Sequence, residues 1–321
     1  MSCGRVKPAF AIAPTIADRL EFVMDLTTCE NPIFIIGSPR SGTSILAWSL
    51  AEHSQLEVFA ESTFLWKIFG NGYAEKAYES AKARSDGRDW LMLYDVTRSE
   101  FLGYLGVGLN ALMSSRCPGK RWIDQTPHNT LMADTLAELF PGAFFLHILR
   151  DGRKVVHSMI NFENVLGKDR AKMLKDSGLL SEWAKDFPAA CKAWSWYVES
   201  SMRFCEKHRS RSMTVLNEKL RSDSKKYFRL ILDRLDLPYE QAVADFFRTY
   251  RINSSFREAP QEANADDRVI DSWQQWSDEQ RETFVREAAP TMLKHGLATA
   301  SAFNRENRKV SQPGFAQVRT R

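Results

Sequence analysis

Apolar and polar positions divide the chain into short apolar runs and longer stretches with helical periodicity. The apolar runs predict buried strands, because strands of a parallel sheet are covered on both faces and are apolar throughout. They lie at 32–37 and 143–149, and the segment 212–220 holds a third predicted core strand. Apolar residues at helical spacing predict helices at 15–27, 41–53, 130–140, 150–159 and 189–208. Strands separated by helices indicate a doubly wound α/β domain.

The remaining segments are less regular. Ser277 and Gln280 have the spacing of a capping box and predict a late helix. Residues 66–120 hold helical fragments with scattered glycines, and residues 253–276 are polar and interrupted by a proline. Such segments over an α/β core form lids and acceptor-binding walls, although variable surface is an equal alternative.

The composition is that of an ordinary globular protein, with 321 residues, 44% hydrophobic and 26% charged. The formal net charge is +4, and the last residues account for it through Arg305, Arg308, Lys309, Arg319 and Arg321 against Glu306. We therefore expect one near-neutral domain over residues 1–302, with its core starting at about 31, and a flexible basic tail over 303–321. A broad nucleic-acid surface is not indicated.

The five cysteines are scattered and contain no Cys-x-x-Cys pair. Neither a zinc site nor a disulfide framework is expected, and a reducing, cytoplasmic location fits best. No apolar run approaches the ~18 residues needed to span a membrane. The early segment "PAFAIAPTIA" has two prolines and no clear cleavage site, so it is a poor signal peptide.

The first apolar run leads into "GSPRSGTS", residues 37–44, which is nearly a Walker phosphate-binding loop. Backbone N–H groups of such a loop, followed by a helix N-terminus, form a cradle for an anion. Thr43 stands where a nucleoside triphosphatase has its lysine, while Arg40 supplies a planar guanidinium suited to phosphate or sulfate. The loop residues are Gly37, Ser38, Pro39, Arg40, Ser41, Gly42, Thr43 and Ser44. A purely structural turn is the alternative.

A second basic group follows the second apolar run. Arg150 ends that strand, where ligands of open α/β sheets bind, and Ser158 lies eight residues later on the next helix. One arginine and one hydroxyl beside the loop predict a second phosphate grip. Two grips without a Walker lysine indicate a nucleotide phosphorylated at both ends.

"GSPRSGTS" together with "FPGAFFLHILRDGRKVVHSM" resembles the paired phosphate motifs of sulfotransferases that use 3′-phosphoadenosine 5′-phosphosulfate (PAPS). The closest likeness is to the tyrosylprotein sulfotransferase branch and its bacterial relatives, over residues 31–298. The resemblance implies a P-loop-like core of parallel strands flanked by helices, with helical lids. It also implies that residues 37–44 bind the 5′-phosphosulfate, that Arg40 faces the transferring sulfuryl group, and that Arg150 and Ser158 bind the 3′-phosphate.

Glu61 follows Arg40 by 21 residues, an offset at which the tyrosylprotein branch has its general base. The chemistry needs such a group, because an acceptor hydroxyl loses its proton as it attacks sulfur. The alternative for Glu61 is an acidic residue favoured by a helix N-terminus. Arg268, in the late polar segment, is expected to close over the 3′-phosphate, with a plain surface arginine as the alternative.

The chain departs from the family at one position. In "RWIDQTPHN" the family pattern has a lysine where Gln125 stands, and that lysine stabilises charge on the leaving group's bridging oxygen. Gln125 can donate a hydrogen bond without charge, so Arg40 does more or another cation substitutes. Lys120 and Arg121 are near in sequence, but we expect a strand to point them elsewhere.

For the other candidate residues, a structural role is the alternative to a functional one. His128 is a second possible acid or base, with a structural role favoured. We expect packing roles for His147 and His157, and core positions for the tryptophans Trp183, Trp194 and Trp196. Asn217 and Glu218 are expected to end a core strand beside the crevice, where adenine contact is an open alternative.

These residues predict a PAPS-dependent sulfotransferase that moves a sulfuryl group directly, in line, to a hydroxyl acceptor without a metal. A small molecule, glycan, lipid headgroup or peptide tyrosine remain open as acceptors, and the oligomeric state is not readable. The rivals are a P-loop kinase, which would need Mg²⁺ and a lysine after Gly42, and a nucleotide-binding module whose catalysis has lapsed.

Overall fold

The computed structural model describes residues 26–83, 88–161, 185–252, 261–262 and 272–303. Five parallel strands form its central sheet in the order β2-β3-β1-β4-β5. Their bounds are Ile33–Ile36 (β1), Leu56–Val58 (β2), Arg121–Asp124 (β3), Phe144–Leu149 (β4) and Ser212–Leu216 (β5). A separate antiparallel pair joins Tyr250–Arg251 (β6) to Gln261–Glu262 (β7).

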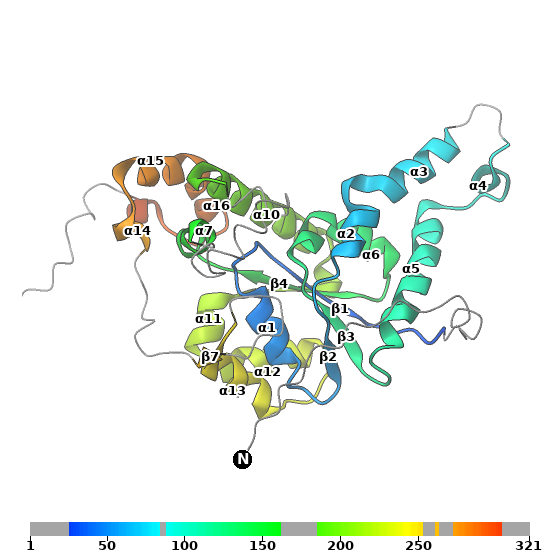
Figure 1. Cartoon of the computed structure of the whole chain (residues 1–321), viewed down its shortest axis with the longest axis horizontal. Helices are drawn as coiled ribbons and strands as arrows, with labels where there is room; N and C mark the ends of the chain where they lie inside the picture. Colours follow the sequence, from blue (N-terminus) through cyan, green and yellow to red (C-terminus); the bar gives the residue numbers. More distant parts are fainter. Residues whose placement is uncertain (1–25, 84–87, 162–184, 253–260, 263–271, 304–321) are drawn as a thin grey trace, which may run out of the picture.

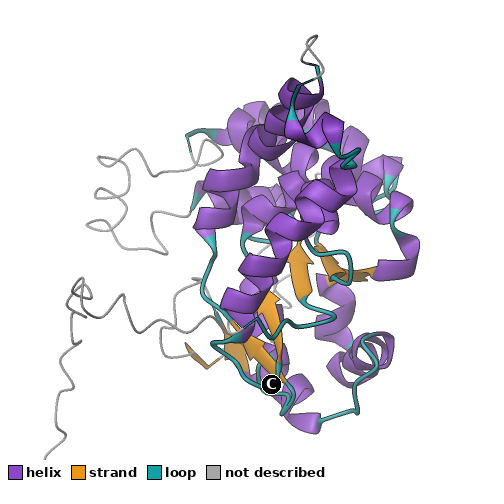
Figure 2. Cartoon of the chain, turned by 90° about the vertical axis from the view of Figure 1, so that its right-hand side faces the viewer, coloured by secondary structure: helices purple, strands orange, loops and turns teal. Residues whose placement is uncertain are grey.

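Helices cover the sheet on both sides (Figures 1 and 2). The α-helices are Thr43–Leu50 (α1), Thr63–Phe69 (α2), Tyr73–Lys82 (α3), Trp90–Leu93 (α4), Arg98–Ser114 (α5), Ala133–Leu139 (α6), Gly152–Ile160 (α7), Phe187–Lys207 (α10), Asn217–Ser222 (α11), Ser224–Arg234 (α12), Gln241–Thr249 (α13), Ser272–Gln275 (α14), Asp278–Glu287 (α15) and Ala289–Lys294 (α16). Four 3₁₀ turns are Gly70–Gly72 (η2), Pro127–Met132 (η3), Arg209–Arg211 (η5) and Ala300–Phe303 (η6). The predicted fold, parallel strands flanked by helices, is confirmed.

Alternate residues of β1 pack on opposite faces of the sheet, as the strand period of two requires. Ile33 and Ile35 join a core with the apolar sides of α1, α12 and α13. Phe34 and Ile36 join a second core with α2, α5 and α6. All four side chains are completely buried, which explains the unbroken apolar run in the sequence.

A third core lies around the long helix α10. Its centre is the fully buried Trp194, which packs with apolar residues of α7, α15 and α16. Gly152 opens α7 directly against the Trp194 ring, where a Cβ would lie 2.8 Å from a ring carbon. This core ties the C-terminal helices to the β4–α7 turn.

Several predicted elements agree with the structure. The strands predicted at 32–37 and 143–149 are β1 and β4, and the helices at 41–53, 150–159 and 189–208 are α1, α7 and α10. Ser277 and Gln280 form the predicted capping box, in which the Ser277 side chain accepts from the Gln280 N–H. The helix predicted at 15–27 lies outside the described residues except for Leu26 and Thr27, which are not helical.

Other predicted bounds were wrong. The strand predicted at 212–220 ends at Leu216, because the chain turns into α11 at the edge of the sheet. The helix predicted at 130–140 is a 3₁₀ turn up to Met132 and an α-helix only from Ala133. The late helix breaks at Ala288, just before Pro290, which cannot donate a helical hydrogen bond. The strand β2 was not predicted, since three residues are too few to show a period.

Within the predicted lid segment 66–120, the helices α3, α4 and α5 form an arm that extends from the sheet at the right of Figure 1. Helix α5 starts at a capping box of Thr97 and Glu100 and packs along α6. Gly106 makes this packing close, since a Cβ there would lie 1.7 Å from the Leu139 carbonyl oxygen. A role for the arm as a lid stays a prediction, as does the domain boundary at residue 302.

Gly106→Ala should destabilise the protein by about 1–3 kcal/mol, because α5 must move away from α6 to admit the methyl group. Gly108→Ala, two residues along the same helix, is the matched control, since a Cβ there meets nothing within 4 Å. The control should be neutral or stabilising by up to about 1 kcal/mol. Urea unfolding measures both free energies, and equal effects at the two positions would contradict the close packing.

Candidate active site

The sheet brings the predicted site residues to one edge. All five strands are parallel, so their carboxyl ends meet there, and ligands of such sheets bind outside these ends. Gly37 follows β1, Gln125 follows β3 and Arg150 follows β4. Glu61 lies beyond β2, and Asn217 follows β5. Motifs separated by more than a hundred residues therefore meet at one edge of the sheet.

The loop after β1 is a tight turn held from below. Gly37 has a φ of 154°, and its N–H donates to Thr130 Oγ1 at 2.9 Å, while the same hydroxyl donates back to the Gly37 carbonyl oxygen at 2.9 Å. The Ser41 N–H donates to the Ser38 carbonyl oxygen at 3.1 Å. Arg40 at the tip has the left-handed φ of 68°, uncommon for a residue with a side chain.

Asn217 holds the other side of the loop. Its Nδ2 donates to the Ser41 carbonyl oxygen at 2.9 Å, and its Oδ1 accepts from Arg221 Nε at 3.1 Å. The approach is so close that a Cβ on Gly42, where φ is 102°, would lie 2.4 Å from Asn217 Nδ2. Both ends of this amide therefore hydrogen-bond to the protein, and Asn217 links the loop to α11.

The two predicted anion grips meet. Arg40 Nε donates to Ser158 Oγ at 3.0 Å, and Arg150 Nη1 donates to the Arg40 carbonyl oxygen at 3.0 Å. Burial and the nearby Arg150 charge lower the pKa of Arg40 to about 10, so Arg40 stays charged at neutral pH. Two partly desolvated guanidinium groups thus lie together at the loop, an arrangement suited to an anion with several negative charges.

Gln125 lies against the far end of the loop. It is fully buried, and its Oε1 accepts a hydrogen bond from Ser44 Oγ at 3.3 Å. Its Nε2 has no hydrogen-bond partner among the described residues. Buried amide donors are nearly always paired, so this N–H is a donor suited to a ligand in the loop.

Lys120 and Arg121 do not compensate for the missing family lysine. They lie at the opposite end of β3 from Gln125, as the predicted strand requires. Lys120 pairs with Glu57 at 3.1 Å, and the Arg121 guanidinium donates to the carbonyl oxygens of Asn31 and Leu235. Arg40 lies in the loop itself, and Arg150 donates to its carbonyl oxygen.

Glu61 lies in the short connection between β2 and α2 and is half-buried. It directly precedes Ser62, the N-cap residue of α2, so the helix-terminus alternative stays open. Burial, together with the Glu61 charge, raises the pKa of the Tyr197 hydroxyl on α10. Glu61 and Tyr197 are therefore close enough to interact electrostatically at this edge of the sheet.

The histidines have packing surroundings. The His128 ring packs at a tilt against Trp66, with 5.2 Å between ring centroids, and burial lowers the pKa of His128. His147 is fully buried in β4, hydrogen-bonds Thr214 through Nδ1, and has a pKa lowered to about 3 by burial. Burial also lowers the pKa of His157, so all three are neutral near pH 7.

The remaining candidates differ in their positions: some lie in the core, some at the surface and some outside the described residues. Trp194 is a core residue as predicted, but Trp196 is 59% exposed, so its predicted core position was wrong because it lies on the outer face of α10. Glu218 accepts from the Asp151 N–H at 3.3 Å and pairs with Lys154 at 3.8 Å, which anchors the start of α7. Arg268 and Trp183 lie outside the described residues.

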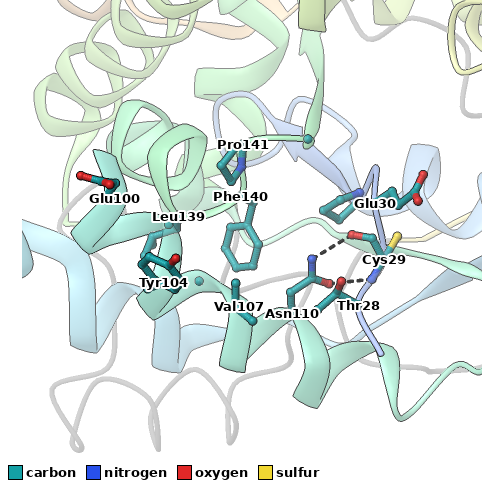
Figure 3. Close-up of a pocket in the computed structure, with 14 residues that line it drawn as sticks. Thr28, Cys29, Glu30, Glu100, Tyr104, Val107, Asn110, Leu139, Phe140 and Pro141 are labelled. Atoms are coloured by element: carbon teal, nitrogen blue, oxygen red, sulfur yellow. Dashed lines mark hydrogen bonds between the residues drawn. The ribbon is translucent and has the colours of Figure 1, made fainter. Parts of the chain in front are cut away.

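A cavity of about 360 Å³ lies away from this edge (Figure 3). It is bounded by the segment leading into β1, by α5 and by the turn before β4. Asn110 forms one wall, accepting from the Cys29 N–H at 3.1 Å and donating to the Cys29 carbonyl oxygen at 2.8 Å. Because it adjoins the amino ends of the strands, this cavity is separate from the candidate site.

Residues 32–241 match the profile of a family described as the sulfotransferase family. This chain belongs to the sulfotransferase family. The match spans the loop, Glu61, Gln125, Arg150, Ser158 and Asn217, so the resemblance predicted from the sequence motifs is confirmed.

Individual relatives share about a quarter of their residues with this chain over the matched region. The chain is 27% identical to a protein-tyrosine sulfotransferase of Drosophila melanogaster over 66% of this chain and 39% of that one. It is 24% identical to protein-tyrosine sulfotransferase 1 of Danio rerio over 66% of this chain and 54% of that one. It thus spans about half the length of these relatives or less. A solved sulfotransferase domain from the curacin biosynthetic pathway has a TM-score of 0.47 at 17% identity, covering 81% of this chain and 98% of that one.

Sequence reasoning on this sulfotransferase-family chain missed several supporting residues. Thr130, assigned to a helix, instead holds Gly37 from a 3₁₀ turn. Asp124, Thr126 and Ser62 form a buried hydrogen-bonded group between β3 and the Glu61 connection. The available signal was Asp124 itself, an acidic residue at the end of a strand that is otherwise buried and apolar.

No helix among the described residues is long and apolar enough to cross a membrane.

Asn217→Ala should weaken both the fold and the anion loop. The Ser41 carbonyl oxygen loses its partner, at a cost of about 1–3 kcal/mol. Asn110→Ala is the matched control, because Asn110 also bridges buried backbone but lies at the distant cavity. Both variants should lower the melting temperature, and only Asn217→Ala should lose the stabilisation that pyrophosphate gives the wild type. An unchanged pyrophosphate response in Asn217→Ala would contradict the holding role.

Proposed function

We propose that this chain is a PAPS-dependent sulfotransferase that transfers a sulfuryl group to a hydroxyl acceptor. The observation that carries the proposal is that the two predicted phosphate-binding motifs, the loop 37–44 and the pair Arg150 and Ser158, are in direct contact. The loop lacks the Walker lysine, and two hydrogen bonds join it to the second motif. Arg40 Nε donates to Ser158 Oγ at 3.0 Å, and Arg150 Nη1 donates to the Arg40 carbonyl oxygen at 3.0 Å. In a chain of the sulfotransferase family, this pair of grips supports a donor with phosphate at both its 5′ and 3′ positions.

The proposal assigns each grip a part of the donor. The loop residues Gly37 to Ser44 bind the 5′-phosphosulfate, because a glycine-rich turn before a helix is an anion cradle. Arg150 and Ser158 bind the 3′-phosphate, while Arg40 faces the sulfuryl group. Arg268, beyond the described residues, closes over the 3′-phosphate. A kinase fits less well, since Thr43 replaces the lysine that would hold the β- and γ-phosphates.

Transfer is direct and in line. The acceptor oxygen forms a bond to sulfur as the bond from sulfur to the bridging oxygen breaks, and that oxygen leaves with the electron pair on 3′-phosphoadenosine 5′-phosphate. Glu61 takes the acceptor proton, and Arg40 stabilises the charge that develops around sulfur. Gln125, in the family's lysine position, donates its Nε2–H to the bridging oxygen. These steps use side chains and loop N–H groups alone.

The acceptor is proposed only as a class. A hydroxyl of a peptide, glycan, lipid or small molecule satisfies the chemistry, and peptide tyrosine is the first to test because both relatives above are named protein-tyrosine sulfotransferases. A reducing, cytoplasmic location is part of the proposal, and the free thiols of Cys29, Cys117, Cys191 and Cys205 support it.

Binding of the spent donor, 3′-phosphoadenosine 5′-phosphate, separates this proposal from a kinase. At 100 times its Kd it should stabilise the fold by about 2.7 kcal/mol, measured as a melting shift. ATP with Mg²⁺ should stabilise less, because it lacks the 3′-phosphate. A shift for ATP with Mg²⁺ that equals or exceeds that for the bisphosphate would favour the kinase.

Glu61→Gln should lower kcat by ~10²–10⁴-fold, since a positioned carboxylate contributes that much as a general base. The variant keeps the size of Glu61, so affinity for the spent donor and the melting temperature should stay near wild-type values. The helix-terminus alternative predicts lost stability with intact turnover. Transfer of a labelled sulfuryl group measures kcat, and a rate within a few-fold of wild type would show that Glu61 is not the general base. His128 would then be the next candidate for that role.

A further inference from the structure

Asp124 is a fully buried carboxylate at the end of β3. Its Oδ1 accepts from the Thr126 N–H at 2.8 Å and from Thr126 Oγ1 at 2.7 Å, and its Oδ2 accepts from Ser62 Oγ. Burial raises its pKa, and these hydrogen bonds oppose that rise. Among the described residues, no lysine or arginine pairs with it. A buried carboxylate satisfied by hydroxyl and N–H groups is a costly choice for stability alone.

Thr126 joins the two sides of this group. Its hydroxyl donates to Asp124 and accepts from the Ser62 N–H at 2.7 Å. Thr126 is fully buried, and Ser62 is 6% exposed. Asp124, Thr126 and Ser62, here called the Asp124 clamp, thus fasten the connection after β2 to the end of β3 by two separate links.

The clamp holds the residue that the proposed reaction needs most. Glu61 directly precedes Ser62, in a connection that follows the edge strand β2 of only three residues. Besides the clamp, the Phe59 N–H bond to the Ile123 carbonyl oxygen at 3.1 Å ties this connection to β3. Ser62 is therefore a point at which the connection that carries Glu61 is fixed to the end of β3.

We infer that the Asp124 clamp positions Glu61 for proton removal. Thr126 is the central positioning residue, because its hydroxyl bonds to both other members of the clamp. The inference rests on the proposed function. Asp124 itself is not a proton acceptor for the substrate, because it is completely buried and its oxygens are occupied by three hydrogen bonds. The clamp acts through the backbone of Ser62, and its effect on catalysis passes through Glu61.

Thr126→Val and Thr126→Ser form a matched pair for the test. Valine keeps the shape and removes the hydroxyl, whereas serine keeps the hydroxyl. Thr126→Val should lower kcat by up to ~10²-fold, the loss expected when a reacting group is displaced by about 1 Å. Thr126→Ser should stay within a few-fold of wild type. Affinity for 3′-phosphoadenosine 5′-phosphate should change little in either, because the hydrogen bonds of the clamp join Ser62, Asp124 and Thr126 to one another and not to the loop residues Gly37 to Ser44.

A double-mutant cycle with Glu61→Gln separates positioning from a general structural role. If the clamp acts through Glu61, Thr126→Val should cost less than about 3-fold in the Glu61→Gln background. Full, independent losses in the double variant would overturn the inference, as would wild-type kcat in Thr126→Val. Should Thr126→Val fail to fold, Ser62→Ala decides the same cycle, because it removes the Asp124 link and keeps the Ser62 N–H. A wild-type chain that binds the bisphosphate but transfers no sulfuryl group would overturn the proposed function and the inference together.

Discussion

Two guanidinium groups, those of Arg40 and Arg150, are held beside each other at the carboxyl edge of the sheet, and much of the surrounding structure serves to keep them there. Their repulsion, with burial, lowers the pKa of Arg40 to about 10. The fold offsets this cost through Ser158, which accepts from Arg40, and through the Arg40 carbonyl oxygen, which accepts from Arg150. Asn217 and Thr130 fix the loop backbone below. The arrangement is stabilised most by a ligand with several negative charges, which is the electrostatic character of the donor that we propose.

Local patterns in the sequence were enough to locate the main elements that meet at the candidate site. A buried parallel strand is apolar throughout, and a glycine-rich turn follows it, so β1, β4 and the anion loop each carry their signal within about ten residues. Arg40 and Ser158 are 118 residues apart, yet each belongs to a motif that begins where a strand ends. Parallel strands then bring those ends together without any long-range information in the sequence.

The supporting residues could not be found in this way, because their roles depend on contacts between distant segments. Asn217 looks like the continuation of a strand until its bond to Ser41, 176 residues away, is seen. Thr126 and Ser62 are ordinary polar residues whose pairing across 64 positions appears only in three dimensions. Trp196 was misplaced because helical periodicity does not reveal which side of α10 is covered by the rest of the chain. The strand β2 is too short for any period to be read.

The position of β1 at the centre of the sheet also has a consequence for biosynthesis. Ile33 pairs with Ile123 of β3 and with Phe144 of β4, so this wholly apolar strand is made long before either neighbour. At ~5–20 residues per second, the ribosome needs on the order of 5–20 s to add the intervening chain. During that interval both edges of β1 are unpaired, the condition under which apolar strands join other chains. Yield in a cell should therefore depend on what shields this strand on the nascent chain as well as on the stability of the finished fold.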